Sequence, residues 1–386
     1  MSNSYAVFPL GELCDVLDSK RRPITKIDRV PGPFPYYGAT GILDHVADYI
    51  FDEPLVLVGE DGAKWASGER TAFAAAGKIW VNNHAHVLRP KRTHLIDQWL
   101  IHYLNFTDLS EFVAGLTVPK LNQGSLREIP IPTPSVKEQQ RIVAILDEAF
   151  AGIATAKANA ETNLRNARQI FESHAQSVFS RRDNAWRTTT LGAEMELLVG
   201  FAFKSAQYTS SEDDIRLLRG DNIIPGCLRW EDVKKWPASD AGNYDRYRLK
   251  EGDVVLAMDR PWIKAGLKRA VISAADVPSL LVQRTACLRS QENIDSRFLM
   301  HLISSDGFVQ HILGVQSGIG VPHISGQQIK DFEFFIPPMA EQKQIADELE
   351  SLGAETERIE FLYTRKLTAL DELKQSLLHQ AFSGQL

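Results

Sequence analysis

Two stretches of the chain repeat apolar residues at alternating spacings of three and four positions. They lie in residues 135–184 and 338–386. This spacing places apolar side chains along one narrow face of an α-helix. Each stretch therefore predicts a long helix of about 45 residues, with a short linker after the first. The first face consists of Ile142, Leu146, Ala149, Ile153, Ala156 and Ala160, continued by Leu164, Ala167, Phe171 and Val178; the second consists of Ile345, Leu349, Leu352, Thr356, Ile359, Tyr363, Leu367, Leu370, Leu377 and Ala381.

A narrow apolar face must be covered, because leaving it in water costs free energy. The two long helices can cover each other as a coiled coil, or each can pack on its own globular domain. We expect the coiled coil, since the faces stay narrow over about six turns.

Short apolar runs precede each long helix and predict β-strands. These runs are Pro54–Val58, Ile79–Val81, Asp253–Ala257 and Leu280–Val282. Helical patterns follow at Asp97–Leu104 and Asp295–Ile303, and glycine and proline clusters separate the elements. We therefore predict two α+β domains, at residues 1–134 and 185–337. Prolines end both domains, at 130, 132 and 134 in the first and at 337 and 338 in the second.

The two halves of the chain repeat one another. Gly115–Pro119 resembles Gly318–Pro322, and at the same spacing Glu138-Gln139 matches Glu341-Gln342 and Phe179-Ser180 matches Phe382-Ser383. Further upstream, Leu10-Gly11 matches Leu191-Gly192. Repetition of this order predicts two copies of one unit, each a domain followed by a helix.

Composition narrows the class of protein. The 386 residues are 44% hydrophobic and 24% charged, which excludes a wholly disordered chain, and no apolar run reaches the roughly 20 residues of a spanning helix. The net charge of −6 gives no overall basic signature. Cys14, Cys227 and Cys287 lie far apart, so neither a disulfide framework nor a cysteine zinc site is expected. The first residues lack a secretory signal, and we expect a cytoplasmic protein.

No motif of a known catalytic site is present. The sequence holds no phosphate-binding GxxxxGK[ST] loop and no methyltransferase-type Asn/Asp-Pro-Pro-aromatic run. His84 and His86 have strand spacing, with His94 and His102 nearby, which would allow a metal site. Histidines in this pattern are more often core or surface residues, so we expect no metal, cofactor or catalytic residue on this chain.

Several segments resemble a known family. They are Tyr36–Ile42 with Gly59–Ala63, then Val118–Asn122, Ile129–Pro132 and Glu138–Asp147, with looser copies at Val321–Ser325 and Glu341–Ala346. In this order they are similar to the specificity subunit of type I restriction–modification systems, over essentially the whole chain.

The resemblance implies a non-catalytic subunit that recognises double-stranded DNA. Each domain would read one half of a bipartite, asymmetric target. The helices would pair antiparallel, set the spacing of the half-sites and dock two methyltransferase subunits, which motor–nuclease subunits would join. S-adenosylmethionine, ATP and Mg²⁺ would be bound by those partners, and no membrane would be involved.

DNA contacts are assigned to amide, basic and small polar side chains on expected loops and strand ends, because these groups suit phosphates and base edges. In the first domain they are Lys64, Trp65, Asn82, Asn83 and His84, with Lys120 and Asn122 near the junction with the helix. In the second they are Arg216, Arg219, Arg260, Lys264, Lys268, Gln283 and Arg284, with His323 and Ser325 near the junction.

Two other classes of function stay open at this point. A coiled-coil scaffold that assembles other proteins without reading DNA would have the same helices. An enzyme with an unrecognised site is disfavoured, because the two copies carry no paired catalytic residues.

Overall fold

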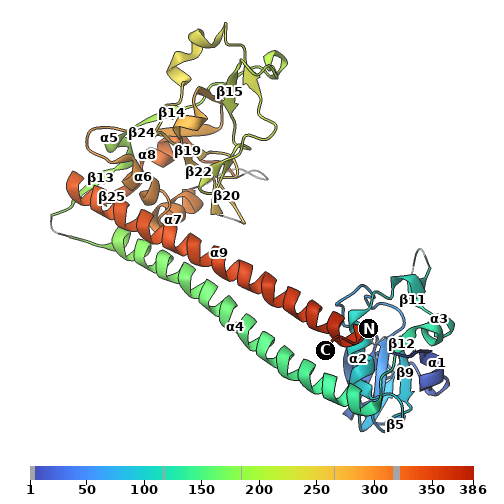
Figure 1. Cartoon of the computed structure of the whole chain (residues 1–386). Coiled ribbons are helices and arrows are strands. Elements are labelled where there is room, and N and C mark those ends of the chain that lie inside the picture. Colours follow the sequence, from blue (N-terminus) through green and yellow to red (C-terminus); the bar gives the residue numbers. More distant parts are fainter. Residues whose placement is uncertain (1–4, 116, 118, 184, 265, 316–321) are drawn as a thin grey trace. The chain divides into compact units, whose positions relative to one another are not determined.

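The computed structural model describes residues 5–386 except 116, 118, 184, 265 and 316–321 (Figure 1). Parts of the predicted repeat Gly115–Pro119 and Gly318–Pro322, and residues 118 and 321 of the family segments, lie outside the described residues. The chain divides into two compact units. The first holds residues up to 162 together with Leu362–Leu386, and the second holds Asn163–Phe361.

The first unit is built on a four-stranded antiparallel sheet with the strand order β2-β9-β6-β7. Its strands are β2 (Cys14–Val16), β9 (Ala85–Pro90), β6 (Leu55–Gly59) and β7 (Ala72–Ala75). A second sheet has the order β4-β3-β8-β5. The other elements are β1 (Val7–Pro9), β3 (Pro31–Gly38), β4 (Gly41–Val46), β5 (Phe51–Asp52), β8 (Lys78–Val81), β10 (Val113–Ala114), β11 (Lys120–Leu121), β12 (Pro130–Pro132), α1 (Leu10–Leu13), α2 (Asp97–Phe106) and α3 (Gln123–Glu128).

Strand β6 explains the uninterrupted apolar run at residues 54–58. Successive strand side chains point to opposite faces, and here both faces are covered. Val56 and Val58 lie in the core that contains α2, whereas Leu55 and Leu57 lie in a separate core with β5 and β8. All four side chains are fully buried.

The second unit repeats this plan. Its central sheet has the order β14-β24-β19-β22, and β19 again divides its apolar residues between two cores. The central strands are β14 (Met195–Val199), β24 (Thr285–Ser290), β19 (Val254–Ala257) and β22 (Arg269–Val271). The other elements are β13 (Arg187–Thr190), β15 (Ile215–Leu218), β16 (Ile223–Ile224), β17 (Cys227–Leu228), β18 (Lys235–Trp236), β20 (Trp262–Ile263), β21 (Gly266–Leu267), β23 (Ser279–Leu281), β25 (Glu333–Ile336), α5 (Leu191–Glu194), α6 (Ser296–Leu302), α7 (Asp306–Val315) and α8 (Gly326–Lys330).

The repeated Leu-Gly pair near the start of each half has a packing role. At Gly11, an added Cβ would lie 3.0 Å from the Cβ of Arg127 on α3. At Gly192, it would lie 2.9 Å from the Cβ of Lys330 on α8. A larger residue at either position would separate the short helix that starts each half from the one that ends its domain.

The two long helices are α4 (Val136–Ser180) and α9 (Met339–Ser383), each 45 residues long, as the apolar spacing predicted. A buried glutamine fixes the start of each. The Gln139 amide accepts from Ile96 N and donates to the carbonyls of His94 and Pro134. Gln342 makes the equivalent bonds with Asp295 N, Asn293 O and Pro337 O. The repeated Glu-Gln pair thus joins each helix to its own domain.

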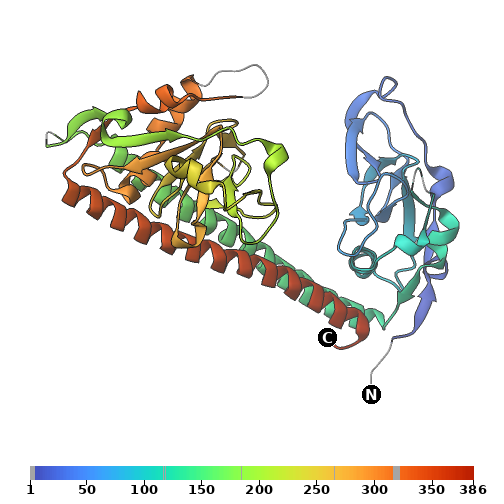
Figure 2. The ribbon, with the colours of Figure 1, turned by 90° about the horizontal axis from the view of Figure 1, so that it is seen from above.

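Within each unit, α4 and α9 lie side by side and antiparallel (Figures 1 and 2). In the first unit Lys157 pairs with Asp371 at 2.5 Å, and in the second Arg168 pairs with Glu360 at 2.5 Å. Ala160 and Ala167 on α4 are buried in these two segments. The expected antiparallel pairing is therefore confirmed.

Packing on the globular domains, the alternative arrangement, is also present at the helix ends. Ile142 and Leu146 of α4 lie in the main core of the first unit, and Ile345 and Leu349 of α9 lie in that of the second. Each helix also ends in the other unit: Phe382 contacts the rings of Trp99, Tyr103 and Phe106, with ring centroids 4.9, 5.0 and 5.6 Å away. Phe179 similarly contacts Phe298 at 5.6 Å. The repeated Phe-Ser pair therefore completes a core.

Replacing Phe382 by Ala is expected to destabilise the first unit by about 2–3 kcal/mol, since a partly buried ring with three aromatic neighbours is lost. The measurement is chemical unfolding of the full chain, followed by tryptophan fluorescence. Leu373→Ala on the same helix is the control, because Leu373 is 47% exposed and should cost under about 0.5 kcal/mol. Equal effects of the two substitutions would contradict the packing role.

No helix of the described residues has both the length and the apolar character needed to cross a bilayer.

Candidate nucleic-acid interface

The same three chain segments meet at the end of the central strand in both units. In the first unit, Glu60 N bonds to His84 O at 2.9 Å, and Leu121 N bonds to Glu60 O at 2.8 Å. In the second, Met258 N bonds to Arg284 O at 2.9 Å, and Ile324 N bonds to Met258 O at 2.9 Å. These bonds make Asp61 equivalent to Asp259, His84 to Arg284, and Lys120 to His323.

In the first unit this end of the sheet presents two ion pairs. Asp61 Oδ1 lies 2.5 Å from Nδ1 of His84, and Lys120 Nζ lies 2.8 Å from Glu60. The His84 side chain is 51% exposed and that of Lys120 is 40% exposed. Both side chains are therefore accessible to a ligand.

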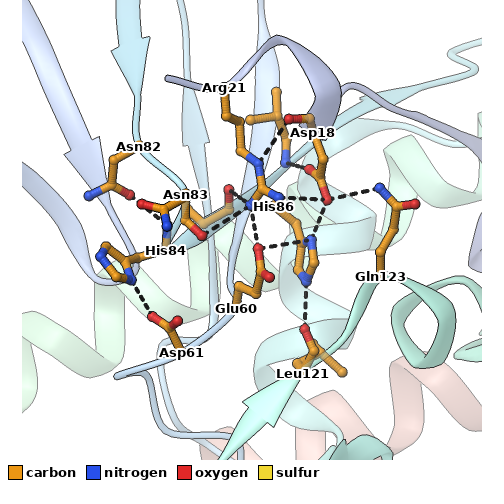
Figure 3. A network of polar contacts seen from close by, with 12 residues as sticks. Asp18, Arg21, Glu60, Asp61, Asn82, Asn83, His84, His86, Leu121 and Gln123 are labelled. Atoms are coloured by element: carbon orange, nitrogen blue, oxygen red, sulfur yellow. Dashed lines mark hydrogen bonds and ion pairs between the residues drawn. The ribbon is translucent and has the colours of Figure 1, made fainter. Parts of the chain in front are cut away.

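A buried polar network lies beneath these pairs (Figure 3). Nδ1 of His86 is 2.6 Å from Asp18 Oδ2, and its Nε2 is 2.7 Å from Leu121 O. The carbonyl of Leu121 can only accept, so Nε2 of His86 donates to it. Arg21 bonds to Glu60 and to the carbonyl of Ala85. The network joins the start of the chain to the strand ends that carry His84 and Lys120.

The charges of this network stabilise its two carboxylates. Burial alone would raise the pKa of Asp18, but the hydrogen bond and charge of His86 bring it below its ordinary value. Burial likewise opposes ionisation of Glu60, and hydrogen bonds from Lys120 and Arg21 lower its pKa overall. Both groups therefore favour the ionised form.

Asp18, Glu60 and His86 are the group of described residues compact enough to hold a metal ion. Their ligand atoms already bond to one another, to Arg21 and Lys120, and to Gln123 and Leu121. The positive charges of Arg21 and Lys120 would repel a metal ion bound at this position. Asp18, Glu60 and His86 therefore suit an internal ion network better than a metal centre. The histidines considered for a metal do not gather: His84 bonds to Asp61 and His102 to Asp147.

In the second unit the equivalent end of the sheet borders a basic cleft with a volume of about 1000 Å³. It is lined by five cationic side chains and two carboxylates: Arg219, Lys234, Arg260, Lys268 and Arg284, with Asp221 and Asp259. Arg219 pairs with Asp221, and Arg284 pairs with Asp259. Among the described residues, Arg260 and Lys268 form no ion pair, which leaves their charges available for an anionic ligand.

Two arginines of this cleft have unusual backbone conformations. The φ angles of Arg260 and Arg284 are +44° and +63°, in the left-handed region that favours glycine. Backbone bonds fix both residues, from Arg260 N to Pro322 O at 2.7 Å and from Met258 N to Arg284 O. Strained backbone conformations are frequent at ligand-binding sites, where they orient a side chain toward the ligand.

Comparison with known proteins shows the family. The model of the Type I restriction modification DNA specificity domain matches twice, over residues 3–163 and 206–362. The chain belongs to the type I restriction modification DNA specificity family. The two matches fall on the two halves that repeat one another in sequence and in sheet order.

Members of the specificity family match along the chain to different extents. The MjaVIII specificity subunit of Methanocaldococcus jannaschii is 22% identical over 99% of this chain and 93% of its own length. The EcoAI specificity subunit of Escherichia coli is 35% identical over 51% of this chain and 32% of its own length. A solved chain from work on complex assembly of the type I R-M system has a TM-score of 0.73 at 16% identity, covering 100% of this chain and 99% of that one. This last likeness concerns the fold.

In this family member, five of the predicted contact residues line the basic cleft: Arg219, Arg260, Lys268, Gln283 and Arg284. His84 and Lys120 lie at the equivalent end of the first unit, where Asn83 precedes His84 and Asn122 follows Leu121 in the chain. His323 lies beside the cleft on Asp259. Lys264 is exposed between β20 and β21, outside the cleft lining, and Lys64 is exposed and pairs with Glu69 at 3.4 Å.

Four predicted contacts instead have structural roles. Trp65 is buried in the core, where its Nε1 donates to Gly59 O, and Asn82 is 3% exposed and accepts from His84 N. Both side chains therefore serve packing and local hydrogen bonding in this structure, and a contact with DNA stays a prediction for them. The Arg216 guanidinium stacks on Trp230 at 4.7 Å and donates to Ala275 O, and Ser325 caps α8. Both of these side chains are engaged within their own unit.

A basic segment was missed by the sequence analysis. Residues 20–29 hold five basic side chains, of which Lys20, Arg22 and Lys26 are exposed. The segment lies beside the predicted site, because Arg22 N bonds to Val81 O and Arg21 reaches the Asn83 carbonyl. The local density of basic residues was the signal that could have found it.

Proposed function

We propose that this chain is the DNA-recognition subunit of a type I restriction–modification complex. Each unit reads one half of a bipartite target, and the paired helices set the gap between the half-sites. The proposal rests on one observation: the specificity-domain model matches twice, on two halves that share a fold but differ in the side chains at the equivalent strand ends. Two different reading surfaces in one chain favour an asymmetric target, whereas two identical subunits would require a palindrome.

The side chains at the equivalent ends of the two central sheets suit binding of duplex DNA. Exposed cations neutralise phosphates and position the protein, and arginine, histidine and amide groups bond to base edges in the grooves. The cleft of the second unit carries five cations against two carboxylates, although the whole chain is acidic. Local charge, and not the net charge, therefore supports binding of a polyanion.

The catalytic work belongs to partners in this proposal. Two methyltransferase subunits dock on the helices and domains, and motor–nuclease subunits join them. These subunits bind S-adenosylmethionine, ATP and Mg²⁺, while this chain contributes target choice alone. A resident cofactor is not part of the proposed role.

Methylome sequencing of a host that expresses this chain with its methyltransferase partner tests the function. We expect modified adenines in a single motif with two unlike halves and a fixed gap. A host expressing the methyltransferase without this chain is the control and should lack the motif. Absence of any modified motif, together with duplex binding that ignores sequence, would favour the scaffold alternative.

A further inference from the structure

The two units share an aspartate at an equivalent position that was not among the predicted contact residues. Asp61 follows β6 and Asp259 follows β19, and each forms an isolated antiparallel bridge, Asp61 with Lys120 and Asp259 with His323. Each aspartate therefore lies where three segments far apart in sequence come together. This is also the end of the sheet that carries the candidate DNA contacts.

The aspartates hold different cations in the two units. Asp259 Oδ2 accepts from Arg284, and its Oδ1 lies 2.6 Å from Nδ1 of His323. Asp61 Oδ1 lies 2.5 Å from Nδ1 of His84, while the neighbouring Lys120 bonds to Glu60. The carboxylates are more covered than the cations: Asp61 and Asp259 are 21% and 24% exposed, whereas His84 and Arg284 are 51% and 64% exposed.

This difference in exposure suits a positioning role. A carboxylate that binds one side of a guanidinium or imidazole leaves its remaining donors directed outward. Arg284 then presents free N–H groups to the cleft, and His84 presents its Nε2 edge. A residue held in place before the ligand arrives loses less rotamer entropy on binding.

We propose that Asp61 and Asp259 are equivalent positioning residues, each of which holds the base- or phosphate-contacting side chain of its own half-site, His84 in the first and Arg284 in the second. This inference rests on the proposed function.

Other ionisable side chains surround both His84 and Arg284. Glu60, Lys120, Arg21 and Asp18 surround the His84 pair, with His86 below. Asp259, His323, Arg260, Lys268 and Asp221 surround Arg284. His323 is unchanged in every variant below.

The experiment measures binding of the complex with its methyltransferase partner to duplexes carrying the full target or a mismatch in one half-site. Asp259→Asn is expected to reduce discrimination at the second half-site about 10-fold and to leave the first unchanged. Asp61→Asn is expected to do the reverse, so each variant is the control for the other. Loss of equal size at both half-sites, or no loss, would overturn the proposal.

A conservative pair of variants gives a readout that separates positioning from folding. Asp61→Glu and Asp259→Glu keep the carboxylate and are expected to recover most of the half-site discrimination that the Asn variants lose. Glu and Asn variants with the same loss at a half-site would refute the inference. If the wild-type complex binds without sequence preference, the proposed function itself fails.

Discussion

Inserting one base pair between the two half-sites is expected to weaken binding of the methyltransferase complex about 100-fold or more. One base pair rotates the second half-site by about 35° around the duplex axis and moves it about 3.4 Å along that axis. Two linked reading surfaces lose their combined affinity once geometry prevents them from binding together. Each of the helices α4 and α9 contributes residues to both units, and in the proposed arrangement the pair sets the gap. Competition binding at fixed salt measures the effect.

Changing the bases of the gap at constant length is the control for this result. Such a change should alter affinity less than threefold, because the gap is not read in the proposed arrangement. Affinity that stays the same after the insertion would contradict the role of the helices in setting the gap. A graded loss with further insertions would indicate that the helices bend.

The second large effect is expected from the double substitution Arg260→Ala and Arg284→Ala. The substitutions remove two arginine side chains from the cleft, both on strained backbone. Each well-placed arginine–base pair accounts for about 1–3 kcal/mol of discrimination between bases. Recognition of the second half-site should therefore fall about 100-fold, while mismatches in the first half-site should keep their full cost. A panel of single-base variants of the target, tested by competition, makes this measurement.

Arg216→Ala provides a control, because it removes one positive charge from the same unit outside the cleft lining. It should leave the preference for bases unchanged. Uniform weakening of the double variant on all sequences, with a shallower dependence on salt, would show instead that Arg260 and Arg284 contact phosphates alone.

Local patterns predicted the elements well. The spacing of Ile142, Leu146 and Ile153 predicted the long helix. Any helix that buries one face has apolar residues at this spacing, whichever part of the protein covers that face. The run at 54–58 predicted a strand for the same reason, although only the structure shows that its two faces belong to different cores.

The site was predicted less completely, because exposure depends on contacts between distant segments. Trp65 and His84 look equally available in the sequence, yet Trp65 fills a core and His84 is half exposed. Asp259 gave no signal, since its partners Arg284 and His323 are 25 and 64 residues away. Basic residues could be listed from the sequence, whereas the carboxylates that orient them could not.

The position of Phe382 has a consequence for biosynthesis. The rings of Trp99, Tyr103 and Phe106 leave the ribosome long before Phe382, the residue that packs on them. At 5–20 residues per second, about 15–60 s separate the two events. During this interval the nascent first unit exposes an aromatic surface, so chaperone binding during translation should concentrate on it.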